Sequence, residues 1–225
     1  MADPNPYSTR HHMSTTLLAS THHPTEGDMK LTTIQVMDKL TETDLTQMVV
    51  PGKNKGERGQ ALELMLGIPN SSALTDLADG ELKTFTLGES IAITQLGHCL
   101  DEVINDHVSF EKSKLGQKLR QTIYVGFAKT GQYKGSRLLK QDTHELHYQH
   151  LKEDFYSICD AIRTAFDKKT RIGTTNGPNN LLQIRTKASK NSKGGYTPLI
   201  FNGVELQNKG MAFYLKADFG KKLLH

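Results

Sequence analysis

Hydrophobic residues recur along most of this 225-residue chain at one of two spacings. Recurrence every three to four residues is typical of an amphipathic helix, and alternation at every second residue is typical of a strand. The helical spacing predicts helices at 30–40, 57–66, 96–108, 145–166 and 219–224, with a further helical turn at 45–49. The remaining apolar segments predict strands at 80–87, 90–94, 122–127, 133–140, 181–187 and 211–215.

The same pattern predicts which helical residues belong to the hydrophobic core. We expect Gly67 to end the second helix and Asp218 to cap the last one. Because strands are interleaved with helices, the sequence predicts an α/β (α+β) fold in which a mixed β-sheet is flanked by helices. The expected core positions are Leu31, Ile34, Met37 and Leu40 in the first helix, Ala61, Leu62, Met65 and Leu66 in the second, Cys99, Leu100, Val103 and Ile104 in the third, and Leu146, Tyr148, Leu151, Phe155, Ile158, Ile162 and Phe166 in the longest.

Composition changes near residue 29. Residues 1–28 are rich in Pro, Ser, Thr and His and show no apolar periodicity, so we expect a disordered arm, with a purification tag as an alternative origin for part of it. Residues 29–225 contain the periodic segments, and their length fits a single domain with a sizeable core.

Charge and cysteine content narrow the class of protein. Lys and Arg number 28 against 24 Asp and Glu, a net charge of +4 that permits nucleic-acid binding without requiring it. Cys99 and Cys159 form no CxxC pair, which favours a reduced intracellular protein. No apolar run is long enough to cross a membrane and the N-terminus does not resemble a signal peptide, so we expect a cytoplasmic protein without a membrane partner.

The candidate chemistry lies at the start of the first predicted strand. Side chains alternate along a strand, so Glu81 and Lys83 share one face, and a short bend can bring Asp76 back beside Glu81. Two carboxylates of this kind suit Mg²⁺, and a neighbouring lysine can orient an attacking water and offset charge on phosphorus. The alternative is a solvated strand face whose Glu/Lys pair is worth a few tenths of a kcal/mol.

A wider set of motifs resembles a nuclease family. The run Lys-Gly-Glu-Arg-Gly-Gln-Ala-Leu-Glu at 55–63, followed by Asp76-Leu77 and by Gly-Glu-Leu-Lys at 80–83, resembles the MutH mismatch-repair endonuclease and the Sau-type restriction endonucleases that cut at GATC. The segments 118–120, 182–188 and 213–216 resemble later blocks of the same family in the same order. The resemblance covers about residues 55–224 and is much more specific than one Glu-x-Lys.

The resemblance implies a fold, a reaction and catalytic residues. It implies the restriction-endonuclease-like PD-(D/E)xK fold and Mg²⁺-dependent, sequence-specific hydrolysis of double-stranded DNA, with Mn²⁺ able to substitute. Asp76, Glu81 and Lys83 correspond to the catalytic residues, and Asp76 and Glu81 to the metal ligands. Glu63 corresponds to an accessory acidic residue on the preceding helix, and Lys118 to a second active-site lysine.

DNA contacts are expected both from basic residues and from the resemblance. Lys53, Lys55, Lys112 and Lys114 are expected to hold phosphates, which adds affinity without sequence information. By resemblance, Arg185 and Lys187 lie at the DNA-reading loop, where an arginine can contact guanine O6 and N7, and Tyr214 corresponds to a tyrosine near the adenine.

Three questions stay open. The bend before the Glu-x-Lys is about two residues shorter than the family's, so Asp79 is an alternative to Asp76, although Leu77 favours Asp76 and Asp79-Gly80 is a common turn dipeptide. The role can be that of a type II restriction enzyme, a MutH-like repair nickase or a non-catalytic DNA-binding module. The protein partner is accordingly a second copy in a homodimer or, for the nickase, a repair protein.

Overall fold

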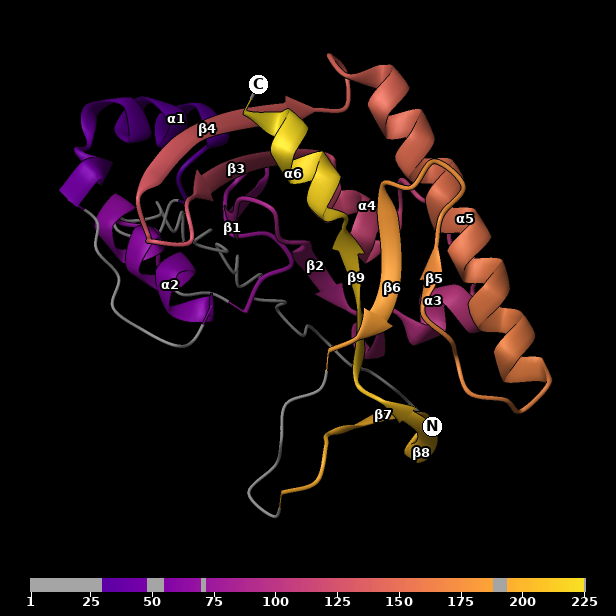
Figure 1. Cartoon of the computed structure of the whole chain (residues 1–225). Helices are drawn as coiled ribbons and strands as arrows, with labels where there is room; N and C mark the ends of the chain where they lie inside the picture. Colours follow the sequence, from indigo (N-terminus) through magenta and orange to yellow (C-terminus); the bar gives the residue numbers. More distant parts are fainter. Residues whose placement is uncertain (1–29, 48–54, 70–71, 188–193, 225) are drawn as a thin grey trace, which may run out of the picture.

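A computed structural model describes residues 30–47, 55–69, 72–187 and 194–224, so the predicted arm at 1–28 lies outside the described residues. These segments form a mixed α/β fold, compatible with the predicted α+β class (Figure 1). The helices are α1 (Thr33–Glu42), α2 (Lys55–Leu66), α3 (Leu100–Ile104), α4 (Lys114–Leu119), α5 (Glu145–Asp167) and α6 (Ala217–Leu223), with 3-10 turns η1 (Leu45–Gln47) and η2 (Leu96–His98). The strands are β1 (Glu81–Thr86), β2 (Ile91–Gln95), β3 (Gln121–Phe127), β4 (Tyr133–Lys140), β5 (Thr175–Asn176), β6 (Leu182–Thr186), β7 (Pro198–Phe201), β8 (Val204–Lys209) and β9 (Met211–Leu215).

The strands pair in three sheets where the sequence predicted one mixed sheet. The first has the order β1-β3-β4, with β1 parallel to β3 and β4 antiparallel to it. The second has the order β2-β9-β6-β5 and its pairings are antiparallel, while β7 and β8 form a hairpin of their own. A tight turn in which Glu89 N donates to Thr86 O follows β1, and β2 beyond it pairs with β9 instead of β1, so a single sheet is not formed.

Two hydrophobic clusters pack on opposite faces of β3. Ile123, Val125 and Phe127 join a cluster with α1 and α2, whereas Tyr124 joins a larger one beneath α5 and the second sheet. The alternation also holds in β1, where Leu82 packs with the first cluster and Phe85 with the second. The strand predicted to carry Glu81 and Lys83 therefore lies between the two clusters, with its N-terminal end beside that of β3.

Several predicted helices differ in detail. Ile34, Met65 and Leu146, predicted to be buried, are 58%, 47% and 71% exposed. The buried face of α1 is Thr33, Val36 and Leu40, and that of α5 starts at Tyr148. The helix predicted at 96–108 is a 3-10 turn followed by the short α3, which ends at Ile104. Asp218 does not cap α6, since Lys216 occupies the N-cap position.

The hairpin β7–β8 was not predicted from periodicity. Asn202 and Gly203 form its turn with φ of 49° and 76°, the left-handed conformation that Asn-Gly turns adopt between antiparallel strands. Asn208 fixes the hairpin to the body, since its side chain accepts from Ile172 N at 2.9 Å and donates to Ile172 O at 2.8 Å. Among the described residues, no helix has the length and apolar character needed to cross a membrane.

Candidate active site

Glu81 is the centre of a network of charged side chains at the first position of β1. Its side chain is 1% exposed, and its Oε1 lies 2.8 Å from Lys118 Nζ. Lys83 Nζ contacts the same oxygen and lies 3.8 Å from Asp76 Oδ2. The structure thus brings together the four residues Asp76, Glu81, Lys83 and Lys118, which come from three separate segments of the chain.

The turn before β1 directs Asp76 back towards Glu81. Leu77 N donates to Gly80 O at 2.9 Å, which closes the turn. Asp76 N donates to Glu81 Oε2 at 3.2 Å, and Leu82 N donates to Asp76 Oδ2 at 3.4 Å. A Cβ at Gly80 would lie 2.4 Å from Gln121 O, so only glycine permits this close approach of the turn to β3.

Lys118 reaches the same place from α4 because β1 and β3 are parallel. Glu81 is paired with Thr122, four residues after Lys118, and Thr122 Oγ1 donates to Lys118 O at 2.7 Å. Ser113 caps α4 by accepting a hydrogen bond from Gly116 N at 3.0 Å. The lysine is therefore held by a capped helix turn beside the strand that carries the carboxylate.

Asp79 has a different set of partners from Asp76. Its Oδ1 accepts from Thr33 N at 2.7 Å, and its Oδ2 accepts from Thr33 Oγ1 at 3.1 Å and from Gln121 Nε2 at 2.9 Å. These bonds join the first turn of α1 to the start of β3. Of the two candidate aspartates, the one that lies within the Glu81 network is Asp76.

The charges of this network also shift the pKa of Glu63, which lies on α2. Burial raises the pKa of the Glu63 carboxyl, repulsion from Asp76 and Glu81 raises it further, and attraction to Lys83 offsets part of the rise. Burial alone would lower the pKa of Lys83, but the carboxylates of Glu81 and Asp76 outweigh that effect and raise it. Lys83 is therefore held as an ammonium group between two carboxylates.

The carboxylates of Asp76 and Glu81 both lie beside Lys83 and offer hard oxygen atoms, the ligand type that Mg²⁺ prefers. Within the described residues, no group of three or more His, Cys, Asp and Glu side chains is arranged to hold a metal ion. Glu63 thus does not complete a three-carboxylate site with them. A two-carboxylate site fits Mg²⁺, which commonly keeps several water or phosphate ligands.

The residues predicted to bind DNA lie around the ends of β6 and β9. Arg185 is within β6, and its guanidinium carbon lies 4.2 Å from the centroid of the buried Tyr214 ring. Lys187 follows β6, and its backbone N donates to Gly210 O at 2.8 Å. Burial lowers the pKa of Lys187 and repulsion from Lys83 lowers it further, so these two ammonium groups are within electrostatic reach.

Four further lysines were predicted to hold DNA phosphates, and the structure describes the side chains of two of them. Lys55 is the first residue of α2, and its side chain lies outside the described atoms, as does the whole of Lys53. Lys112 is exposed, whereas Lys114 Nζ donates to His98 O at 2.6 Å and lies 3.7 Å from Glu102 Oε1. Lys114 therefore supports η2 in addition to carrying charge.

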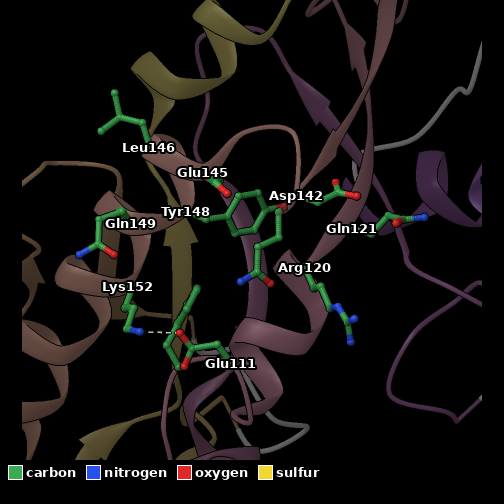
Figure 2. A pocket seen from close by; sticks show the side chains of 11 residues that line it. Glu111, Arg120, Gln121, Asp142, Glu145, Leu146, Tyr148, Gln149 and Lys152 are labelled. Carbon is green, nitrogen blue, oxygen red and sulfur yellow. Dashed lines mark hydrogen bonds and ion pairs between the residues drawn. The ribbon is translucent and has the colours of Figure 1, made fainter.

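The described residues line hollows at the surface, of which two concern the site. One of about 970 Å³ lies between α4 and the start of α5 and contains Glu111, Asp142 and Glu145, with Lys152 bonded to Glu111 (Figure 2). The other, of about 640 Å³, lies between η2, the ends of β6 and β9 and the hairpin, and it includes Lys187. The sequence did not predict the second hollow because its hairpin wall was missed, although the Asn202-Gly203 dipeptide was a signal for it.

Comparison of the chain with known protein-family models gave no match, and neither did comparison with curated proteins. The resemblance to MutH and the Sau-type restriction enzymes therefore stays a prediction.

Proposed function

We propose that this protein is a Mg²⁺-dependent endonuclease that hydrolyses phosphodiester bonds of double-stranded DNA, with the type II restriction enzymes as its class. The observation that carries the proposal is the network in which Lys83 lies between Asp76 and Glu81 while Lys118 contacts Glu81. A surface Glu/Lys pair has no need of a carboxylate that is 1% exposed and shared by two ammonium groups. The resemblance described above independently assigns catalytic roles to these four residues.

The residues divide the work of phosphodiester hydrolysis. Asp76 and Glu81 would hold Mg²⁺, which when bound supplies a Lewis acid for the phosphate oxygens. Lys83, an ammonium group directly beside both carboxylates, orients the attacking water and offsets negative charge that develops on the phosphate. Lys118 fixes the orientation of Glu81, and Glu63 adds negative charge near the metal position.

Two other roles use the same residues differently. A MutH-like nickase would cut one strand, and a non-catalytic DNA-binding module would bind without cutting. Nicking and double-strand cleavage would use the same ion network. The network does favour an enzyme over a module, because binding alone does not require a buried carboxylate between two lysines.

The test is cleavage of supercoiled plasmid DNA by the full chain and by the variants Glu81→Gln and Lys83→Met. We expect the wild type to cleave in Mg²⁺ and to stop when EDTA removes the metal. Each variant should lose about 100-fold or more in cleavage rate, because each removes a group that acts on the developing charge. Binding of DNA in Ca²⁺ should change little, since these groups serve the reaction more than docking.

The conservative shapes of Gln and Met preserve packing, so circular dichroism and the melting temperature check that each variant folds. The product identifies the role: nicked circles indicate a nickase, and linear DNA indicates a restriction-type enzyme. Binding without metal-dependent cleavage by the wild type would leave only the binding module and would refute the proposed activity.

A further inference from the structure

The hollow of about 640 Å³ beside Lys187 has a lining that suits a polyanion. Its residues include Lys187 and His98 but no Asp or Glu, and Gly97 and Gly210 leave backbone accessible within it. The hollow between α4 and α5, by contrast, contains three acidic residues (Figure 2). That hollow also contains the basic residues Arg120 and Lys152, so its charges are mixed, whereas the lining of the first hollow has basic but no acidic side chains. The first hollow is therefore the better complement to phosphate.

Lys187 connects the hollow with the candidate active site through its charge. It lies in the wall of the hollow, and repulsion from Lys83 adds to the effect of burial in lowering its pKa. A DNA strand bound at Asp76 and Glu81 would therefore lie in the positive field of both lysines. The wall that faces Lys187 across the hollow comes from the hairpin β7–β8, through Pro198, Leu199 and Ile200.

The hairpin carries a cation on the exposed side next to this hollow. Lys209, at the end of β8, holds its Nζ 3.6 Å from the centroid of the Tyr196 ring, which is 44% exposed. Lys209 pairs with Pro198 and precedes Gly210, both of which line the hollow. The ring orients the ammonium group beside the hollow. The acidic Glu205 pairs with Ile200, another lining residue, so the hairpin carries one acidic side chain as well as Lys209 next to the hollow.

The hairpin is also held firmly enough to act as a wall. Leu199 and Phe201 are buried in the large hydrophobic cluster, and Phe201 packs edge-on against Phe166 with centroids 5.4 Å apart. The buried Asn208 makes two hydrogen bonds to the backbone of Ile172. In Figure 1 the hairpin lies just beyond the ends of β6 and β9, on the far side from α6.

We infer that this hollow and the hairpin β7–β8 form a second phosphate-binding wall for the substrate DNA, in which His98, Tyr196 and Lys209 contact the sugar-phosphate backbone opposite Lys187. The inference rests on the proposed function, because it takes double-stranded DNA as the ligand. It adds the hairpin β7–β8, which lies outside the ion network, to the surface that binds DNA. Contacts of this kind give affinity that is independent of base sequence and falls with salt.

The test is binding of a labelled DNA duplex of random sequence in Ca²⁺ at several salt concentrations, by the full chain and by His98→Ala, Tyr196→Ala and Lys209→Gln. We expect each variant to weaken binding several-fold, and Lys209→Gln to reduce the slope of log affinity against log salt by about one. Lys209→Arg should keep both the affinity and the salt slope of the wild type. Lys129→Ala is the matched control, because Lys129 is exposed after the opposite, C-terminal end of β3.

The outcomes separate this inference from the proposed function. If the wild type binds and cleaves DNA while His98→Ala, Tyr196→Ala and Lys209→Gln keep its affinity and salt slope, the second wall is refuted and the proposed function stands. If the wild type does not bind DNA at all, both fail. If Lys129→Ala weakens binding as much as Lys209→Gln does, the effect belongs to net charge, and the assigned wall is wrong.

Discussion

At the scale of single residues, the same side-chain type serves different purposes three positions apart. Asp76 lies 3.8 Å from Lys83 within the charged network, whereas Asp79 accepts hydrogen bonds from Thr33 and Gln121. A carboxylate that accepts the N–H of the first helical residue stabilises α1, because that N–H has no partner within the helix. We therefore expect Asp76 to affect the reaction and Asp79 to affect the stability of the fold.

We predict that Asp76→Asn lowers the rate of DNA cleavage about 100-fold or more with little effect on stability. Asp79→Asn should keep most of the activity but lower the free energy of unfolding by about 0.5–2 kcal/mol, since it weakens the attachment of α1. Plasmid cleavage in Mg²⁺ and urea denaturation measure the two effects. An active Asp76→Asn beside an inactive Asp79→Asn would show that the shortened bend places the other aspartate at the metal.

The ionised Glu63 carboxylate is expected to lower the stability of the fold and to assist DNA cleavage. Burial and the charges of Asp76 and Glu81 raise its pKa, so the folded protein binds this proton more tightly than the unfolded chain does. Proton binding by Glu63 therefore adds to the free energy of unfolding. This gain is complete below the ordinary pKa of about 4.5 and is lost as the pH rises through the raised pKa of the folded protein.

Glu63→Gln should therefore melt at a higher temperature than the wild type at pH 7, and the difference should vanish at acidic pH below that ordinary value. Cleavage should fall, because charge near the metal position is removed. Thermal melts over a pH series measure the difference, and Glu57→Gln, exposed in the first turn of the same helix, is the control. A stability gain for Glu63→Gln that is equal at all pH values would contradict this account.

At the scale of elements, a buried carboxylate joins α5 to the start of β6. Asp154 is 0% exposed and accepts from Asn179 N at 2.6 Å, Leu181 N at 2.8 Å and Leu182 N at 2.8 Å. A side chain at Gly177 would collide with it, since a Cβ there would lie 2.1 Å from Asp154 Cγ. The start of the strand that leads to Arg185 and Lys187 is thus fixed by one helical residue.

Asp154→Ala should lower the free energy of unfolding by about 2–4 kcal/mol, because it leaves several buried N–H groups without an acceptor. Asp160→Ala on the same helix should cost less than about 1 kcal/mol, since its ion pair with Arg163 is at the surface. Urea denaturation of both variants gives the comparison. Equal losses would mean that Asp154 does not anchor β6.

At the scale of the whole molecule, the candidate site forms where separate parts of the chain meet. Asp76 and Glu81 flank one turn, Lys118 comes from α4, and Lys187 comes from the end of β6 in the second sheet. The two hydrophobic clusters on opposite faces of β3 hold these parts in place. The charged groups are thus positioned by a rigid frame that none of their own segments could provide alone.

The sequence by itself determined the local features of this protein. The sequence predicted β4 and β9 with their observed bounds and α5 to within one residue. The helical period of α5 is clear, and β9 is a continuous apolar run that is buried throughout. Alternation also predicted that Glu81 and Lys83 share a face, since that follows from strand geometry alone. A short bend before the strand predicted that Asp76 could return to Glu81, whereas Glu63 and Lys118 were added to the site only by the resemblance.

Only the tertiary structure decided what depends on contacts between distant segments. Periodicity cannot tell which strands pair, so it predicted one sheet where the described residues form three. It also missed the hairpin, because the apolar residues Ile200 and Val204 are exposed and break the alternation. It assigned Ile34 and Leu146 to the core because burial depends on what packs against a helix. The roles of Asp79 and Asp154 depend on partners more than 20 residues away, and hydrogen bonds over that distance leave no local pattern in a sequence.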